Sequence, residues 1–114
     1  MVEIQSRNRR IQTSAQKMRM VLDLVRGKDV EEALAILNFT PNKSATEVAR
    51  TIRAAQADAE NVYDIDPENL YVKVIYADEG QTFRRWRARA RGRVNRRLKR
   101  TSHLTVVLGE RDED

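Results

Sequence analysis

The sequence lacks cysteine, and it holds only one histidine, two prolines and four glycines among its 114 residues. Without cysteine, disulfide frameworks and thiolate metal sites are excluded. No apolar run approaches the ~20 residues of a membrane-spanning helix, and Met1 to Arg10 lack the apolar segment of a signal peptide. We therefore expect a cytoplasmic protein without membrane contact. A single domain over residues 1–114 is expected, since domains commonly contain about 100–150 residues.

Groups of residues that support catalysis are also missing. His103, the only histidine, has no carboxylate neighbours at the spacing of metal ligands, which favours a structural or partner-contacting role over catalysis. There is no glycine-rich phosphate loop and no set of serine, histidine and acid in a plausible order. We predict no enzymatic activity, no cofactor and no bound metal.

The formal net charge of +5 is modest, but its distribution is not. Residues 1–28 carry a net charge of +5, residues 29–80 of −7 and residues 101–114 of −3. Residues 81–100, the basic block, carry ten basic and no acidic side chains. This block holds twice the net charge of the whole chain, and it repels itself unless an anionic partner is nearby.

Apolar residues at helical spacing predict two short helices in the first third of the chain. The first begins at Thr13, with Gln16 at capping-box spacing, and ends at Gly27, since glycine adopts the left-handed conformation at little cost. The second begins at Asp29, with Glu32 at the same spacing, and ends before residues 40–42.

A third and longest helix is predicted from Ser44, with Glu47 as its capping-box partner, to about Tyr63. Its many alanines favour helix formation and close packing against a sheet or another helix. Its apolar positions follow a spacing of three and four residues, namely Val48, Ile52, Ala55, Ala59 and Val62.

The pattern then changes to that of extended chain. Tyr71–Tyr76 and Leu104–Leu108 are rich in β-branched residues and predict two paired strands. Residues 3–11 alternate loosely and predict a further short strand or arm. The expected fold class is α+β, with three helices packed on a small antiparallel three-stranded sheet and a long protruding β-hairpin at about residues 81–100.

The basic block is too long for an ordinary hairpin turn, because connections above about a dozen residues are usually functional or disordered. In its centre, arginines at 87, 89, 91 and 93 alternate with small residues. A period of two in an extended chain places these four guanidinium groups on one side. If strand pairing continues through the block, the arm from Leu70 to the tip reaches ~60 Å at ~3.3 Å per residue.

The residue types of the block suit RNA. Nine of its ten basic residues are arginine, whose planar fork binds phosphate bidentately and stacks on bases. Phe83 and Trp86 offer ring faces to unpaired bases. The basic residues of the first third of the chain predict a second RNA contact on the body.

Three other interpretations of the block remain open at this stage. A run of charge can be a solvated, disordered segment or a localisation signal. Basic β-arms also grip the minor groove of DNA in nucleoid proteins, although such arms commonly carry an apolar wedge at the tip. In a protein-binding module, the acidic helices would dock a partner and folding and binding would survive deletion of the block.

Three separated segments carry a resemblance to a known family. The chain resembles the L22 family of large-subunit ribosomal proteins over essentially its whole length, and its length fits the bacterial type. The matching residues are Arg84, Arg89–Arg93 and Arg100–Val106 in the basic block and after it, Ser14–Arg19 and Asp23–Lys28 in the first helix, and Leu70–Lys73 and Ala77–Gly80 before the block.

The resemblance implies that the chain binds large-subunit rRNA, acts early in assembly and lies in the ribosome beside neighbouring ribosomal proteins. It also implies that the hairpin tip lines the peptide exit tunnel and meets the nascent peptide, and that no DNA is bound. The residues expected to contact rRNA are Arg7, Arg9, Arg10, Lys17, Arg19, Arg84, Arg85, Trp86, Arg87, Arg89, Arg91, Gly92, Arg93, Arg96, Arg97, Lys99, Arg100 and His103. Those expected at the tunnel-lining tip are Arg87, Ala88, Arg89, Ala90, Arg91, Gly92, Arg93, Val94 and Asn95.

Overall fold

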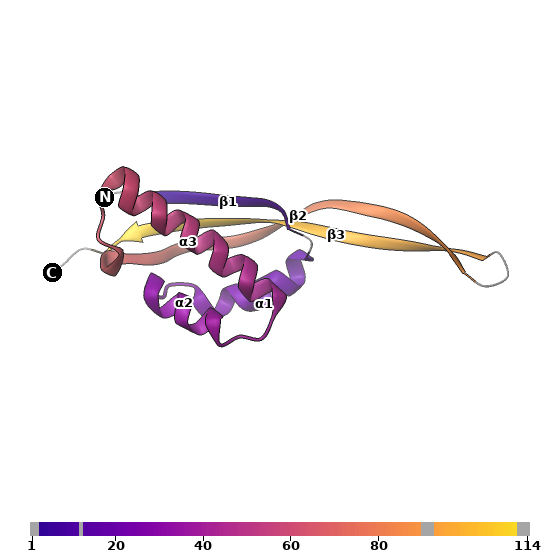
Figure 1. Ribbon diagram of the computed structural model, residues 1–114, viewed down its shortest axis with the longest axis horizontal. Helices are drawn as coiled ribbons and strands as arrows, with labels where there is room; N and C mark the ends of the chain where they lie inside the picture. The colour runs from indigo at the N-terminus through magenta and orange to yellow at the C-terminus, as the bar shows by residue number, and fades with distance from the viewer. Residues whose placement is uncertain (1–2, 12, 90–92, 112–114) are drawn as a thin grey trace.

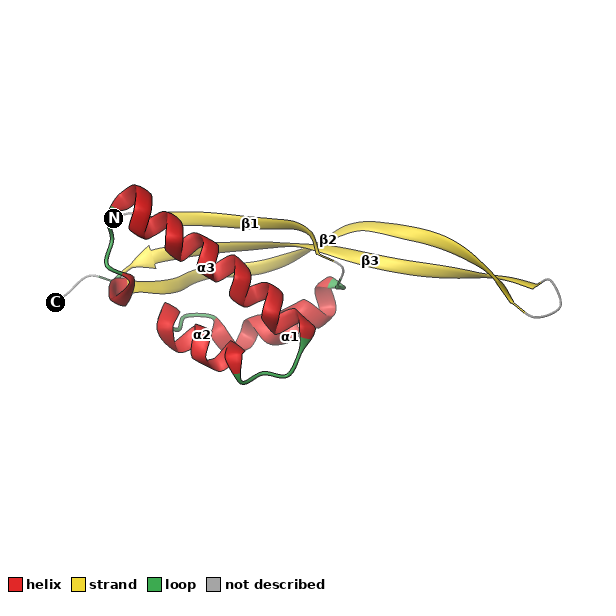
Figure 2. Cartoon of the chain, in the orientation of Figure 1, coloured by secondary structure: helices red, strands yellow, loops and turns green. Residues whose placement is uncertain are grey.

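Three helices cover one face of a three-stranded antiparallel sheet, as the sequence predicted (Figures 1 and 2). The computed structural model describes residues 3–11, 13–89 and 93–111, with the backbone alone for Arg10 and residues 81–100. Its elements are β1 (Glu3–Ile11), α1 (Ala15–Val25), α2 (Val30–Asn38), α3 (Lys43–Tyr63), the 3₁₀ helix η1 (Pro67–Asn69), β2 (Leu70–Arg89) and β3 (Arg93–Glu110).

The sheet has the order β1-β3-β2, so that β3 is the central strand. Strand β1 pairs with β3 only as far as Ile11, which stands opposite Ser102. Beyond that level β2 and β3 continue as a pair, to Arg89 opposite Arg93. The two-stranded part projects from the body as a long arm (Figure 1).

The molecule is correspondingly elongated. Its principal extents are 69 × 26 × 18 Å and its radius of gyration is 17.3 Å, against the ~13 Å expected for a compact domain of this length. The helices and the three-stranded part of the sheet lie together at one end, and the arm forms the other (Figure 1).

The core lies between the helices and one face of the sheet. Leu104, Val106 and Leu108 of β3 are fully buried at alternate positions, as period two requires of a strand with one covered face. Met18 and Leu22 of α1 are equally buried against them in one cluster. Burial of such side chains contributes about 1.5–3 kcal/mol each.

Helix α1 ends as predicted but begins one residue later than predicted. Gly27 has φ +79°, the left-handed conformation that glycine adopts readily. The N-cap, however, is Ser14, whose side chain accepts a hydrogen bond from the Lys17 amide at 3.4 Å. The predicted cap at Thr13 was wrong because the Thr13 amide donates to the Ile11 carbonyl in a tight turn that closes β1.

The capping residue predicted for α3 was also wrong. Asn42 is the N-cap, and its side chain accepts from the Ser44 amide at 2.9 Å. Ser44 lies inside the helix and is buried, while Glu47 accepts a hydrogen bond from Asn8 of β1. Four of the five apolar positions predicted for this helix are buried, but the fifth, Val62, is 70% exposed.

Asp29 occupies the N-cap of α2, as predicted, but its side chain makes no capping hydrogen bond within the described chain. Its carboxylate pairs instead with Arg111, which follows β3. The loop between α1 and α2 also pairs with the start of β2, since the Gly27 amide donates to the Val72 carbonyl and the Val72 amide to the Lys28 carbonyl. The loop between α1 and α2 is thereby fixed both to β2 and to the residue that follows β3.

Candidate nucleic-acid interface

The backbone of the basic block forms the arm. Pairing runs without interruption from Thr82 opposite Arg100 to Arg89 opposite Arg93. At ~3.3 Å per residue this ladder is about 25 Å long. The predicted hairpin is therefore confirmed in its backbone, while Ala90, Arg91 and Gly92 of the predicted tip lie outside the described residues.

The register of the arm sets like charges opposite one another. Arg85 stands opposite Arg97, and Arg89 opposite Arg93. Like charges at directly opposed positions destabilise an antiparallel pair, and the block contains no acidic residue to offset them. A two-stranded ribbon with this register gains stability when a polyanion neutralises it.

Two irregularities in strand pairing mark the root of the arm. The register shifts between Asn8 and Ile11 in β1 and between Glu79 and Thr82 in β2. Such bulges bend a strand and redirect the residues beyond the bend. They lie where the sheet narrows from three strands to two, so they set the direction in which the arm leaves the body.

Gly80 lies in the second of these bulges, beneath two β3 side chains. A Cβ added to Gly80 would lie 2.5 Å from the Thr101 hydroxyl oxygen and 3.2 Å from the ring of His103. No side chain fits this space unless Thr101 or His103 moves. His103, predicted to contact rRNA, is thus placed at the root of the arm and is only partly exposed.

The predicted body contacts in β1 lie close to this root. Arg7 stands opposite Thr105 of β3, and Arg9 lies in the β1 bulge beside His103. Both arginine side chains are exposed, and neither forms an ion pair within the described part of the chain. For Arg10 only the backbone is described.

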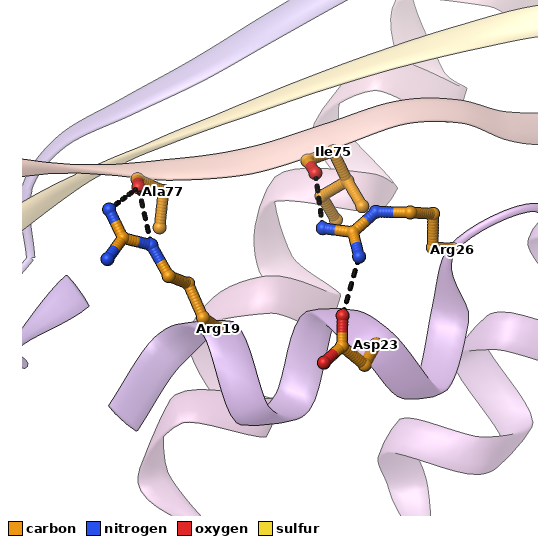
Figure 3. Close-up of polar contacts among 5 residues, drawn as sticks. All are labelled: Arg19, Asp23, Arg26, Ile75 and Ala77. Carbon is orange, nitrogen blue, oxygen red and sulfur yellow. Dashed lines mark hydrogen bonds and ion pairs between the residues drawn. The ribbon is translucent and has the colours of Figure 1, made fainter. Parts of the chain in front are cut away.

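The predicted contacts in α1 differ from one another. Lys17 is exposed, and its ammonium has no ion pair among the residues that the structure describes. Arg19, in contrast, donates from Nε and Nη2 to the Ala77 carbonyl of β2, at 3.3 and 2.9 Å (Figure 3). Arg26 likewise donates to the Ile75 carbonyl at 3.0 Å while it pairs with Asp23 (Figure 3). These two arginines satisfy carbonyls along the outer edge of β2, which protects the edge from pairing with another chain.

The contact of Arg19 gives a prediction that separates its structural role from a role in RNA binding. The Arg19→Met variant keeps the aliphatic stem, and we expect it to lower the free energy of unfolding by about 1 kcal/mol. We expect it to leave the salt dependence of rRNA binding unchanged. Lys17→Met is the matched control, with unchanged stability and a salt slope lower by about 0.7–0.9, the value for one lost phosphate contact. A lower salt slope for Arg19→Met would instead make this guanidinium an RNA contact.

Acidic side chains gather at the end of the body away from the arm. Exposed carboxylates lie in the first turn of α2, in the last turns of α3 and at η1, namely Glu31, Glu32, Asp58, Glu60, Asp64, Asp66 and Glu68. The end of α3 and η1 lie opposite the arm (Figure 1). The charge separation seen in the sequence is therefore also a separation in space, with the basic arm directed away from the acidic end.

Among the described residues, no helix is long and apolar enough to cross a membrane. The same residues contain no group of three side chains that could hold a metal ion. The features that stand out are the arm, its root and the exposed arginines beside it.

A helical body from which a basic two-stranded arm projects defines a class of protein that reaches into a folded nucleic acid. Comparison with known families makes this specific: the model of the ribosomal protein L22p/L17e family matches residues 6–109. The chain belongs to this family, whose members are structural proteins and not enzymes.

The chain is also similar to curated bacterial proteins over nearly its whole length. It is 48% identical to the large ribosomal subunit protein uL22 of Thermomicrobium roseum, covering 98% of this chain and 95% of that protein. It is 52% identical to the proteins of the same name from Roseiflexus sp. and from Carboxydothermus hydrogenoformans, covering 90% of this chain and 91% of each relative.

The sequence analysis did not include Tyr76 or Thr105 among the residues expected to contact rRNA. Tyr76 is 42% exposed on β2, on the side of the sheet away from the helices, and Thr105 lies beside it on β3. The sequence did contain a signal for the exposure of Tyr76. Its two direct neighbours, Ile75 and Ala77, are apolar and buried, so alternation along the strand turns Tyr76 to the other face. Period two alone places a strand residue outside, but it does not tell whether another element covers it.

Proposed function

We propose that this chain is a structural constituent of the large ribosomal subunit, in which the arm binds large-subunit rRNA. The proposal rests on the family of the chain and on the names of its relatives. The observation that carries it furthest is the two-stranded arm, because its paired backbone holds nine basic residues and no acidic one. The place of action would be the bacterial cytoplasm, within the ribosome.

The arginines of the arm would neutralise phosphates where RNA segments converge. Each phosphate that is neutralised releases condensed counterions, which drives association and makes it dependent on salt. Consecutive arginines, at 84 and 85 and at 96 and 97, fall on opposite faces of extended strands, which favours a site where RNA surrounds the arm on more than one side. Arg7, Arg9 and Lys17 would extend the contact to the part of the body nearest the arm.

The tip of the arm would reach deepest into the subunit. Residues 87–95 would line the peptide exit tunnel and meet the nascent peptide, while the acidic end would stay at the surface near neighbouring ribosomal proteins. An arm that joins several RNA segments also accounts for a role early in assembly. The length of the molecule, 69 Å, supports this arrangement, since it is long enough for its two ends to have different surroundings.

A sucrose gradient of a bacterial lysate after a high-salt wash tests the proposal. We expect the intact chain to sediment with the large subunit, because an arm enclosed by RNA is released only when the RNA unfolds. Sedimentation near the top of the gradient, or together with the nucleoid, would contradict the proposal. The second outcome would favour a DNA-binding protein with basic arms.

A further inference from the structure

One face of the three-stranded sheet is not covered by any of the described helices. In β3, Leu104, Val106 and Leu108 point to the helices, so the residues between them belong to the other side, which we call the open face. Pairing places Arg7 of β1 and Tyr76 of β2 on either side of Thr105. These three residues form one row across the open face, in which each residue lies about one strand spacing from its neighbour.

The next row toward the far end of the body is less polar. Val107 of β3 lies there between Gln5 and Val74. Val74, like Tyr76, is 42% exposed. The open face therefore presents an aromatic ring and an aliphatic side chain next to each other on β2, with an arginine across the sheet from the ring.

The two tyrosines of β2 differ in their surroundings. The ring of Tyr71 packs over Gly109, where an added Cβ would lie 2.8 Å away, and the Arg111 guanidinium lies 4.6 Å from the ring centroid. Tyr71 therefore already has partners within the chain. No ring or cation contact of this kind involves Tyr76 within the described residues.

Within the described part of the chain, Arg7 and Arg9 of the open face have no ion-pair partner. At the far end, Lys73 pairs with Glu3 across β3, and this hydrogen bond raises the pKa of Lys73, so both charges are used within the protein. Closer to the arm, the carboxylate on this face is that of Asp78, which stands opposite His103. Arg7 and Arg9 form no ion pair with any described carboxylate. The basic side of the open face continues directly into the arm.

Thr105 adds a polar group at the centre of the row. Its side-chain hydroxyl is buried between its neighbours and has no hydrogen-bond partner among the described residues. Buried hydroxyls in proteins nearly always have a partner. A ligand that moves the side chains of Arg7 and Tyr76 apart would supply one.

We propose that the open face binds an unpaired segment of RNA, with one base stacked on Tyr76. Arg7 and Arg9 bind the flanking phosphates, and the Thr105 hydroxyl bonds a ribose 2′-hydroxyl or a phosphate oxygen. Aromatic side chains on a sheet with arginines beside them are a common way to hold single-stranded RNA. The continuity of the unpaired arginines with the basic block, which has no acidic residue, favours RNA as the occupant because a polyanion can neutralise both at once.

This inference rests on the proposed function, and it adds a stacked base at Tyr76 and a hydrogen bond at Thr105 to the contacts of the arm and of Arg7 and Arg9. The test is a binding titration of the full-length chain with full-length large-subunit rRNA at several salt concentrations. We expect Tyr76→Ala to weaken binding about five- to a hundredfold, the range for one base stacked on a ring, without changing the salt slope. Arg7→Gln should lower the salt slope by about 0.7. Tyr76→Phe, which keeps the ring, should bind as the original chain does.

Matched variants on another face serve as controls. Tyr63→Ala removes a tyrosine that is 51% exposed at the far end of α3, and Arg53→Gln removes an exposed arginine of the same helix. Both should bind rRNA as the original chain does. If Tyr76→Ala also binds unchanged while loss of the arm arginines abolishes binding, the open-face site is refuted and the proposed function stands. If loss of the arm arginines has no effect either, the proposed function fails too.

A photo-crosslink identifies the occupant directly. With p-benzoylphenylalanine in place of Tyr76 in assembled subunits, we expect irradiation to join the chain to rRNA. A crosslink to another protein, or none to RNA, would overturn the inference.

Discussion

Replacement of Arg89, Arg91 and Arg93 by alanine is expected to weaken binding to large-subunit rRNA at least about a hundredfold. Hydrogen bonds to charged groups are worth about 1.5–3 kcal/mol each, and each tenfold change in affinity corresponds to about 1.4 kcal/mol. The three changes should also lower the slope of log affinity against log salt by about 2–3, because each phosphate contact contributes about 0.7–0.9. A filter-binding titration at several salt concentrations measures both quantities.

A control with the same change in net charge separates the arm from a general effect of charge. Lys43, Arg50 and Arg53 are exposed on α3, and their replacement by alanine also removes three positive charges. We expect this variant to keep nearly the full affinity and salt slope. Equal losses in the two triple variants would mean that overall charge, and not the arm, governs binding.

The second large effect is expected at the root of the arm. In Gly80→Val the new side chain meets the Thr101 hydroxyl and the ring of His103, so we expect these side chains to shift and the bulge to open or tilt. A rotation of about 10° at the root of a ladder about 25 Å long displaces its end by about 4 Å. We expect rRNA binding to fall about tenfold or more, while the free energy of unfolding falls by only about 1–3 kcal/mol, as overpacking does.

A glycine at the opposite end of the body provides the control for lost stability. Gly27 has φ +79° and open space around it, so Gly27→Ala strains the backbone without a clash. The strain costs about 1–2 kcal/mol, comparable to Gly80→Val, yet rRNA binding should be unchanged. Thermal unfolding by circular dichroism and the same titration compare the two variants. If both lose affinity equally, stability and not the direction of the arm is responsible.

Helices and strands with a regular apolar repeat, and with a residue such as glycine that ends the element, could be predicted from the sequence. The helix end at Gly27, the strand at Tyr71–Tyr76 and its partner at Leu104–Leu108 all appear where they were expected. Local sequence determines them, because the apolar positions of each element face one core. The arm could also be predicted, since two strand patterns bracket the basic block and its arginines alternate with small residues as in extended chain.

Features that depend on neighbours distant in the sequence could not be predicted. Asn42 caps α3 in place of Ser44, which lies inside the helix and is buried, and only the packed fold reveals this burial. Arg19 resembled a free cation in the sequence, but the carbonyl it binds belongs to Ala77, 58 residues away. The bulges at the root depend on strand register, which is weakly specified where a strand is polar on both faces or contains glycine, as around Gly80.

The candidate interface also has a part that could be predicted from the sequence and a part that could not. The arginines of residues 84–100 were visible as composition, and the structure adds their register across the arm. The site inferred on the open face required knowledge of which sheet face the helices leave uncovered. A tyrosine can occupy either a buried or an exposed position in a strand, so the sequence alone does not show whether Tyr76 is exposed.

The most direct test of the account compares the intact chain with one in which residues 81–100 are replaced by a short turn, on the same high-salt gradient. Circular dichroism must first show that the shortened chain keeps its helices and a cooperative unfolding transition. We expect the intact chain to remain with the large subunit and the shortened chain to move to the top of the gradient. Retention of both chains with the large subunit would contradict the claim that the arm holds the protein in ribosomal RNA.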